Sequence, residues 1–171
     1  MFAWPEANTG LGSDTGHMSN LTVVVDDLSG PEIAAFLEEH VRQMRAITPL
    51  ESKYALDLDS LRRPEITFWS VLASGTIVGC GALKRLDPGH AEIKSMRTAP
   101  ARRGGGVASL LLTHMITEAR RLGYRRLSLE TGTDEFFRPA RGLYEKFGFA
   151  YCDPFADYGP SAYNTFMTKT L

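Results

Sequence analysis

This chain of 171 residues has few cysteines and lacks both long apolar runs and an excess of one charge. Its two cysteines, Cys80 and Cys152, have no Cys-x-x-Cys spacing, which indicates reduced thiols in a cytoplasmic protein. No apolar run approaches the roughly 20 residues that span a bilayer. With 19 basic and 20 acidic residues, the net charge of −1 gives no reason to expect a nucleic-acid partner. We therefore expect one globular domain that binds neither membranes nor nucleic acid.

The first 20 residues differ from the rest of the chain. They mix Gly, Thr, Ser, Asn and Pro without periodicity, and they lack the basic start and apolar stretch of a signal peptide. We expect residues 1–20 to be a poorly ordered extension and residues 21–171 to form the domain. Either Met1 or Met18 is compatible with a natural start.

The sequence of the domain predicts strands that are first joined by hairpins and later alternate with helices. The pattern predicts strands at 21–28, 65–73, 76–86, 91–99, 124–131 and 164–171, and helices at 29–44, shortly before Pro64, from the glycine stretch to about Leu122, and at 136–148. Ser74-Gly75 fits a hairpin turn. This order indicates an α/β protein with one mixed sheet and helices on its faces.

Three consecutive glycines, Gly104 to Gly106, stand between a predicted strand end and a predicted amphipathic helix. The apolar face of that helix would comprise Val107, Leu110, Leu111, Met115, Ala119 and Leu122. Free N–H groups and the positive dipole end of a helix start favour an anion, and glycine lets it approach the backbone. A phosphate or pyrophosphate is the expected ligand. A flexible loop without a ligand is the alternative.

Two known phosphate motifs do not fit this stretch. It lacks the Gly-Lys-Ser/Thr ending of nucleotide hydrolases, and it has neither the spacing nor the early position of the dinucleotide fingerprint. Instead, the segment from Arg103 to Ala108 resembles the Arg/Gln-x-x-Gly-x-Gly/Ala signature of GCN5-related N-acetyltransferases (GNAT). The later stretch "ARGLYEKFGFAY" is similar to the Leu-Tyr-Glu-Lys-x-Gly-Phe segment of the same family. The resemblance covers about Leu21 to Leu171, and the tail is similar to a subgroup labelled indole-acetate acetyltransferases.

The resemblance implies a fold, a co-substrate and most of a site. The fold would be a central, mostly antiparallel sheet with helices on both faces. Acetyl-CoA would be the co-substrate, without a metal. Its pyrophosphate would bind at Arg103, Gly104, Gly105, Gly106, Val107 and Ala108, and its thioester would be polarised by backbone N–H groups near Met96, Arg97 and Thr98.

The resemblance also assigns two catalytic side chains. Tyr144 matches the family tyrosine that faces the CoA sulfur, and a phenol of pKa about 10 can donate a proton at neutral pH. The alternative for Tyr144 is a packed aromatic residue. Glu92 corresponds to a base in some family members. It would need a raised pKa or a relay through water, because direct transfer from a lysine-like amine is uphill by about 6 pKa units. The alternative for Glu92 is an ion pair with Lys94 on the same strand face.

The acceptor pocket is the least specified part of the predicted site. Its candidates are His40, Met44, Ser52, Tyr54, Glu130, Phe155 and Tyr158. His40 lies among apolar residues of the first helix, where a lone histidine is more often packed than a ligand. The alternative for Phe155 and Tyr158 is that they cover the end of the sheet. The prediction is an acetyl-CoA-dependent N-acetyltransferase acting on a small-molecule amine. A protein lysine or N-terminal acetyltransferase and a non-catalytic CoA-binding module are the alternatives. The sequence does not decide between a monomer and a homodimer.

Overall fold

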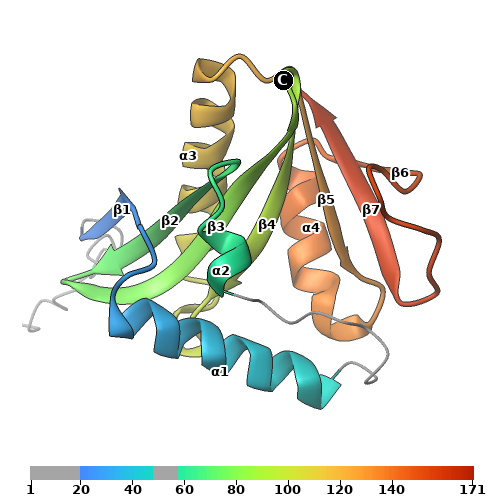
Figure 1. Ribbon diagram of the computed structural model, residues 1–171. Helices are drawn as coiled ribbons and strands as arrows, with labels where there is room; N and C mark the ends of the chain where they lie inside the picture. The colour runs from blue at the N-terminus through green and yellow to red at the C-terminus, as the bar shows by residue number, and fades with distance from the viewer. Residues whose placement is uncertain (1–19, 48–57) are drawn as a thin grey trace, which may run out of the picture.

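A computed structural model describes residues 20–47 and 58–171, and within them a seven-stranded sheet runs in the order β1-β2-β3-β4-β5-β7-β6 (Figure 1). The elements are β1 (Leu21–Val25), α1 (Pro31–Ile47), α2 (Leu58–Leu61), β2 (Ile66–Ala73), β3 (Thr76–Asp87), β4 (His90–Thr98), the 3-10 turn η1 (Pro100–Arg102), α3 (Val107–Arg121), β5 (Arg126–Gly132), the 3-10 turn η2 (Glu135–Phe137), α4 (Arg138–Lys146), β6 (Ala150–Cys152) and β7 (Asn164–Thr170). The predicted extension, apart from Asn20, lies outside the described residues.

The sheet is mostly antiparallel, as predicted. Only β4 and β5 pair in parallel, and every other neighbouring pair is antiparallel. The predicted hairpin turn is confirmed: Ser74 and Gly75 both have positive φ, 50° and 82°, between β2 and β3. This conformation matches the twist of the two strands that it joins. The short strand β6, which pairs with β7, was not predicted, because three residues are too few for a periodic signal.

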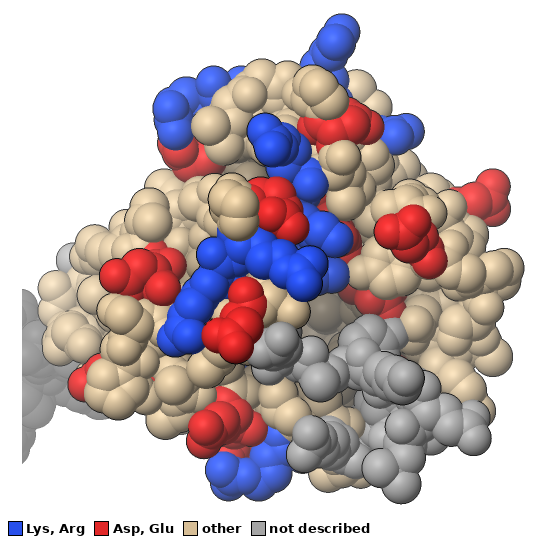
Figure 2. Space-filling view, in the orientation of Figure 1, with Lys and Arg blue, Asp and Glu red and all other residues tan. Residues whose placement is uncertain are grey.

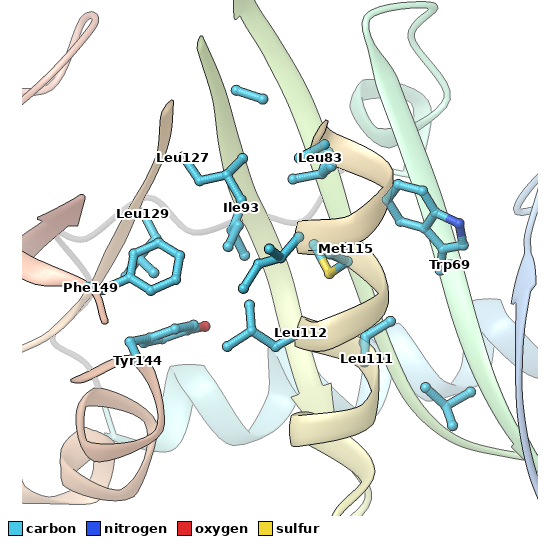
Figure 3. Close-up of a cluster of buried hydrophobic side chains, with 14 of the residues drawn as sticks. Trp69, Leu83, Ile93, Leu111, Leu112, Met115, Leu127, Leu129, Tyr144 and Phe149 are labelled. Carbon is cyan, nitrogen blue, oxygen red and sulfur yellow. The ribbon is translucent and has the colours of Figure 1, made fainter. Parts of the chain in front are cut away.

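Helices cover both faces of the sheet, which confirms the predicted layering. In Figure 1, α1 and α2 lie in front of the sheet, and α3 and α4 lie behind it. The rear core packs α3 and α4 on the sheet and includes Leu111, Met115, Ile93 and Leu129 (Figure 3). The front core is smaller and joins Ile33 and Leu37 of α1 to the other face of β2 and β3.

The buried face of α3 differs from the prediction at one end. Val107, Leu111, Met115 and Ala119 are buried, as expected, but Leu122 is 45% exposed. Leu122 is the C-cap residue, beyond the last turn that faces the sheet, and the chain reverses at Gly123 (φ 86°). The face also includes Leu112 and Ile116, because α3 is covered on a wider arc than the predicted stripe.

A β-bulge in β4 determines the geometry of the site. Ser95 has a φ of 55°, and the β3–β4 register shifts between Cys80 and Ala82. The parallel pairing of β4 with β5 ends at Ile93↔Leu129, although both strands continue. The final residues of β4 therefore have a backbone edge that β5 does not pair.

Candidate active site

A cleft of about 630 Å³ opens where β4 ends, beside the start of α3. The described residues that line it come from α1, the end of β4, the glycine loop, α3, η2 and α4: His40, Gln43, Met44, Met96, Arg97, Thr98, Arg102, Arg103, Gly104, Gly106, Val107, Ala108, Ser109, Phe136, Phe137, Pro139, Ala140, Leu143, Tyr144 and Lys146. The cleft thus brings together most of the predicted cofactor residues, Tyr144, and two of the predicted acceptor residues. Its described lining contains basic side chains and no Asp or Glu.

The glycine loop gives the start of α3 an open anion site. Gly104 and Gly106 have φ values of 76° and 79°, a left-handed conformation that L side chains rarely adopt. Gly106 is the N-cap of α3, and no side chain caps the helix. The first N–H groups of a helix have no intrahelical acceptor. This helix start can therefore hold a phosphate or pyrophosphate group by its backbone.

Two arginines add positive charge beside this helix start. Arg102 and Arg103 are exposed and line the cleft. The Arg103 guanidinium carbon lies 5.5 Å from the centroid of the Phe136 ring, a cation–π distance that holds the side chain against η2. Gly105 alone of the predicted loop residues does not line the cleft. A Cβ at Gly105 would lie 3.1 Å from the Arg102 carbonyl oxygen, so this position serves the tight turn.

The end of β4 forms the next wall of the cleft. Met96, Arg97 and Thr98 all line it, on the side of the bulge where β5 no longer pairs. The bulge changes the order in which successive side chains of β4 alternate between the two faces of the sheet. Met96 therefore faces α3, and Arg97 faces α1, where its guanidinium carbon lies 4.8 Å from the centroid of the Phe36 ring. An unpaired backbone edge at this position can donate N–H groups to a carbonyl oxygen in the cleft.

Tyr144 connects the cleft to the rear core. It is 5% exposed, and its ring meets Phe149 edge-on with centroids 5.7 Å apart. Figure 3 shows its hydroxyl directed away from α4 toward α3. Burial raises the pKa of the Tyr144 phenol, so the hydroxyl stays protonated at any physiological pH. Tyr144 therefore packs in the rear core and also lines the cleft.

Glu92 lies on the front face of β4 and does not line the cleft. It is 2% exposed, and its Oε1 accepts hydrogen bonds from Tyr158 Oη at 2.5 Å and from Lys94 Nζ at 2.9 Å. Lys94 Nζ also donates to Tyr158 Oη at 3.0 Å. The ion pair with Lys94 is thus present, but it is buried at the carboxylate rather than exposed to solvent. Neither Tyr158 nor Lys94, the two described partners of this carboxylate, lines the cleft.

The predicted acceptor residues are divided between two places. His40 and Met44 line the cleft from α1. Phe155 and Tyr158 instead pack on each other and on Phe166, with centroids 5.2 to 5.8 Å apart, over the front of β7. Glu130 of β5 is half-buried opposite Phe166 in the register. Ser52 and Tyr54 lie outside the described residues.

The electrostatic environment favours a neutral histidine next to a buried cation. Burial, and then the positive charge of Arg97, lower the pKa of His40 to about 4. Burial also lowers the pKa of Arg97, and it raises the pKa of the Cys80 thiol to about 12. Cys80 is fully buried and therefore unsuited to act as a nucleophile.

The sequence did not reveal several lining residues. Gln43, Phe136, Phe137 and Lys146 reach the cleft because α1, η2 and α4 converge there, and no spacing in the chain encodes that convergence. The described residues contain no group of three or more His, Cys, Asp or Glu side chains that could hold a metal ion. None of the described helices is both long enough and apolar enough to cross a membrane.

Comparisons with known proteins agree with this geometry. The chain matches the Acetyltransferase (GNAT) family over residues 33–149. It is 52% identical over 149 residues to the uncharacterized N-acetyltransferase YsnE of Bacillus subtilis (strain 168), covering 87% of this chain and 99% of that relative. It is 39% identical over 155 residues to the IAA acetyltransferase of Azospirillum brasilense, covering 90% of this chain and 100% of that relative.

A solved structure shows the same fold. The GNAT family acetyltransferase from Elizabethkingia anophelis, crystallised with acetyl-CoA bound, matches with a TM-score of 0.63 and 20% identity, over 90% of this chain and 99% of that chain. This chain belongs to the GNAT family and is an acetyltransferase. The predicted membership of the GNAT family is confirmed.

Proposed function

We propose that this protein transfers an acetyl group from acetyl-CoA to the amine of a small molecule. The observation that carries the proposal is the uncapped start of α3, behind the left-handed Gly104 and Gly106, in the same cleft as Tyr144. A helix start of this kind suits the pyrophosphate of CoA. The acetyl-CoA bound in the Elizabethkingia anophelis structure, which shares the fold, supports this choice of ligand.

Each wall of the cleft has a task in the proposed reaction. Acetyl-CoA, when bound, supplies an acetyl group activated as a thioester. The N–H groups at the start of α3 and the arginines Arg102 and Arg103 hold its phosphates. The unpaired edge of β4 at Met96 to Thr98 donates N–H groups to the thioester oxygen, where negative charge develops. Binding and polarisation thus come from two adjacent backbone segments.

Tyr144 stabilises the departing sulfur. Full proton transfer from a phenol of pKa 10 or more to a thiolate whose thiol titrates near 8.5 is uphill by at least about 1.5 pKa units, or about 2 kcal/mol. The raised pKa of Tyr144 increases that cost. The hydroxyl therefore acts mainly as a hydrogen-bond donor to the charge that develops on sulfur.

The amine must lose a proton when its nitrogen bonds to the acetyl carbon. We assign Glu92 as the final proton acceptor, reached through the Tyr158 hydroxyl, because the 2.5 Å contact couples these two groups strongly. Lys94 Nζ forms an ion pair with Glu92 Oε1 at 2.9 Å. Because Tyr158 does not line the cleft, water would carry the amine proton to the Tyr158 hydroxyl, which would pass one proton to Glu92 and remain a phenol.

The test is a screen of amine acceptors with acetyl-CoA, followed by thiol release and by mass spectrometry of the products. The proposal predicts equal amounts of free CoA and of a product heavier by one acetyl group for at least one small amine. Acetylation of peptide lysines or N-termini, with no small amine modified, would favour a protein acceptor. Binding of acetyl-CoA without any product would indicate a binding module.

A further inference from the structure

Arg97 is a buried cation without hydrogen-bond partners at two of its nitrogens. Its side chain is 8% exposed, and neither Nε nor Nη1 has an acceptor within the described structure. The sequence assigned only the backbone of Arg97 to the site. Nevertheless its side chain lines the cleft, on the face of the sheet that carries α1.

Among the described residues no ion pair involves Arg97, and the charged side chains that affect its pKa include Glu39 and Arg103. The nearby carboxylate of Glu39 is engaged on both oxygens: Arg42 Nη1 lies 2.7 Å from its Oε2, and Gln43 Nε2 donates to its Oε1 at 3.0 Å. His40, the titratable neighbour on α1, is neutral at pH 7. Figure 2 shows basic side chains gathered across the middle of this face of the molecule, with acidic ones beside them.

A buried guanidinium with unpaired donors is costly in the free protein. Leaving charged donors without partners away from water destabilises a fold, so such an arrangement is expected where a ligand completes it. Nε together with Nη2, or Nη1 together with Nη2, presents two parallel N–H donors whose geometry matches the two oxygens of a carboxylate. The guanidinium carbon lies 4.8 Å from the centroid of the Phe36 ring, a cation–π contact that holds this end of the side chain against α1.

We propose that Arg97 binds a carboxylate of the acceptor, so that the substrate class is small amino acids or related amines that carry a carboxylate. This inference rests on the proposed function. The phosphates of acetyl-CoA have their own site at the start of α3 with Arg102 and Arg103, whereas Arg97 comes from β4 and stacks on α1. The cleft therefore has two neighbouring groups of cationic side chains, with Arg103 near enough to lower the pKa of Arg97, and it can receive two anionic groups.

The experiment compares acceptor pairs that differ only in the carboxylate, an amino acid and the amine obtained by removing its carboxyl group. The unmodified protein should acetylate the better amino acids with a kcat/KM about 10- to 100-fold above that of the matching amines, the range expected for a charge-assisted hydrogen-bonded pair. Arg97→Gln should reduce that preference to nearly one. It should raise the KM for the amino acid and leave the Kd of acetyl-CoA within about twofold.

Two further variants sharpen the comparison. Arg97→Lys keeps the charge but loses the fork, and it should restore only part of the preference. Arg120→Gln removes an equal charge from the exposed surface of α3, outside the cleft, and should change nothing. The comparison within the unmodified protein stands even if Arg97→Gln folds poorly.

The outcomes separate the two proposals. Turnover of small amines with no preference for a carboxylate would overturn the role of Arg97 and leave the proposed function intact. A preference that survives unchanged in folded Arg97→Gln would also overturn it. A large loss of acetyl-CoA affinity in Arg97→Gln would place this side chain at the phosphates instead. No turnover with any amine would defeat the proposed function, and the inference with it.

Discussion

Replacing Tyr144 with Phe should slow acetyl transfer strongly while the fold and the binding of acetyl-CoA persist. The change removes one oxygen from a side chain that is 5% exposed, and the ring keeps its edge-on contact with Phe149 at 5.7 Å. No described residue pairs with the hydroxyl through a hydrogen bond, so no partner is left unsatisfied. We expect the free energy of unfolding to change by less than about 1 kcal/mol.

The rate should respond much more than the stability. Removing one preorganised hydrogen-bond donor to the charge that develops in the transition state typically costs about 10²- to 10³-fold in rate. We therefore expect kcat to fall by about 100-fold or more, equivalent to about 2.7 kcal/mol of transition-state stabilisation. The KM for acetyl-CoA should stay nearly constant, because its phosphates bind at another segment.

The assay requires a good acceptor and conditions in which the chemical step limits turnover. Thiol release is measured for the parent protein and for Tyr144→Phe at equal folded fraction, with calorimetry for acetyl-CoA. Tyr144→Ala serves as a control, since it should lower the free energy of unfolding by about 3–5 kcal/mol through lost packing. Equal kcat in the parent and in Tyr144→Phe would remove the hydroxyl from the mechanism and leave Tyr144 a packed aromatic residue.

Three further predictions concern the glycine loop, the contact between Glu92 and Tyr158, and the half-buried His40. Gly106→Asp strains a position with φ of 79° and places a negative charge beside the phosphates of acetyl-CoA. Calorimetry should therefore show the affinity for acetyl-CoA falling by about 100-fold or more. The control Gly142→Asp, where a Cβ would meet open space, should bind acetyl-CoA normally. Glu92→Gln and Tyr158→Phe should lower kcat by similar factors and together by little more than either alone; kcat values at the parent level in both would exclude the proton route. Because the pKa of His40 is about 4 in the fold and about 6.5 when unfolded, the unfolded chain takes up the proton first as pH falls, and stability present above pH 6.5 should decline by up to about 3 kcal/mol toward pH 4. Urea unfolding at pH 7 and 4.5 measures this decline, which should be smaller in His40→Gln; identical pH dependence in both proteins would contradict it.

Local signals predicted the elements and the phosphate side of the site. The Ser74-Gly75 turn, the glycines before α3 and the end of α3 at Gly123 depend on backbone conformations that few residues adopt, so the sequence itself marks them. The order of hairpins and helices was enough to predict a mixed sheet covered on both faces. The family resemblance then gave the mostly antiparallel pairing.

The acceptor side depends on contacts between distant segments, which no local pattern marks. Tyr158 meets Glu92 across 66 positions of sequence. The bulge at Ser95 changes which side of β4 each later residue faces, so simple alternation could not place Arg97 on the α1 face. The Arg97 guanidinium is buried without a described hydrogen-bond acceptor at Nε or Nη1 because α1, β4 and the glycine loop meet around it, and no local pattern in the sequence indicates that meeting. Leu122 was misplaced because helical periodicity does not indicate where the neighbouring sheet ends.

The most direct test of the central claim is a crystal structure of this protein with acetyl-CoA or CoA bound. The account predicts the pyrophosphate at the N–H groups that begin α3, beside Gly104 and Gly106, and the sulfur within hydrogen-bond reach of the Tyr144 hydroxyl. It also predicts the thioester oxygen against the backbone of Met96 to Thr98. A pyrophosphate bound away from the glycine loop, or a sulfur remote from Tyr144, would contradict the assignment of this cleft as the site of acetyl transfer.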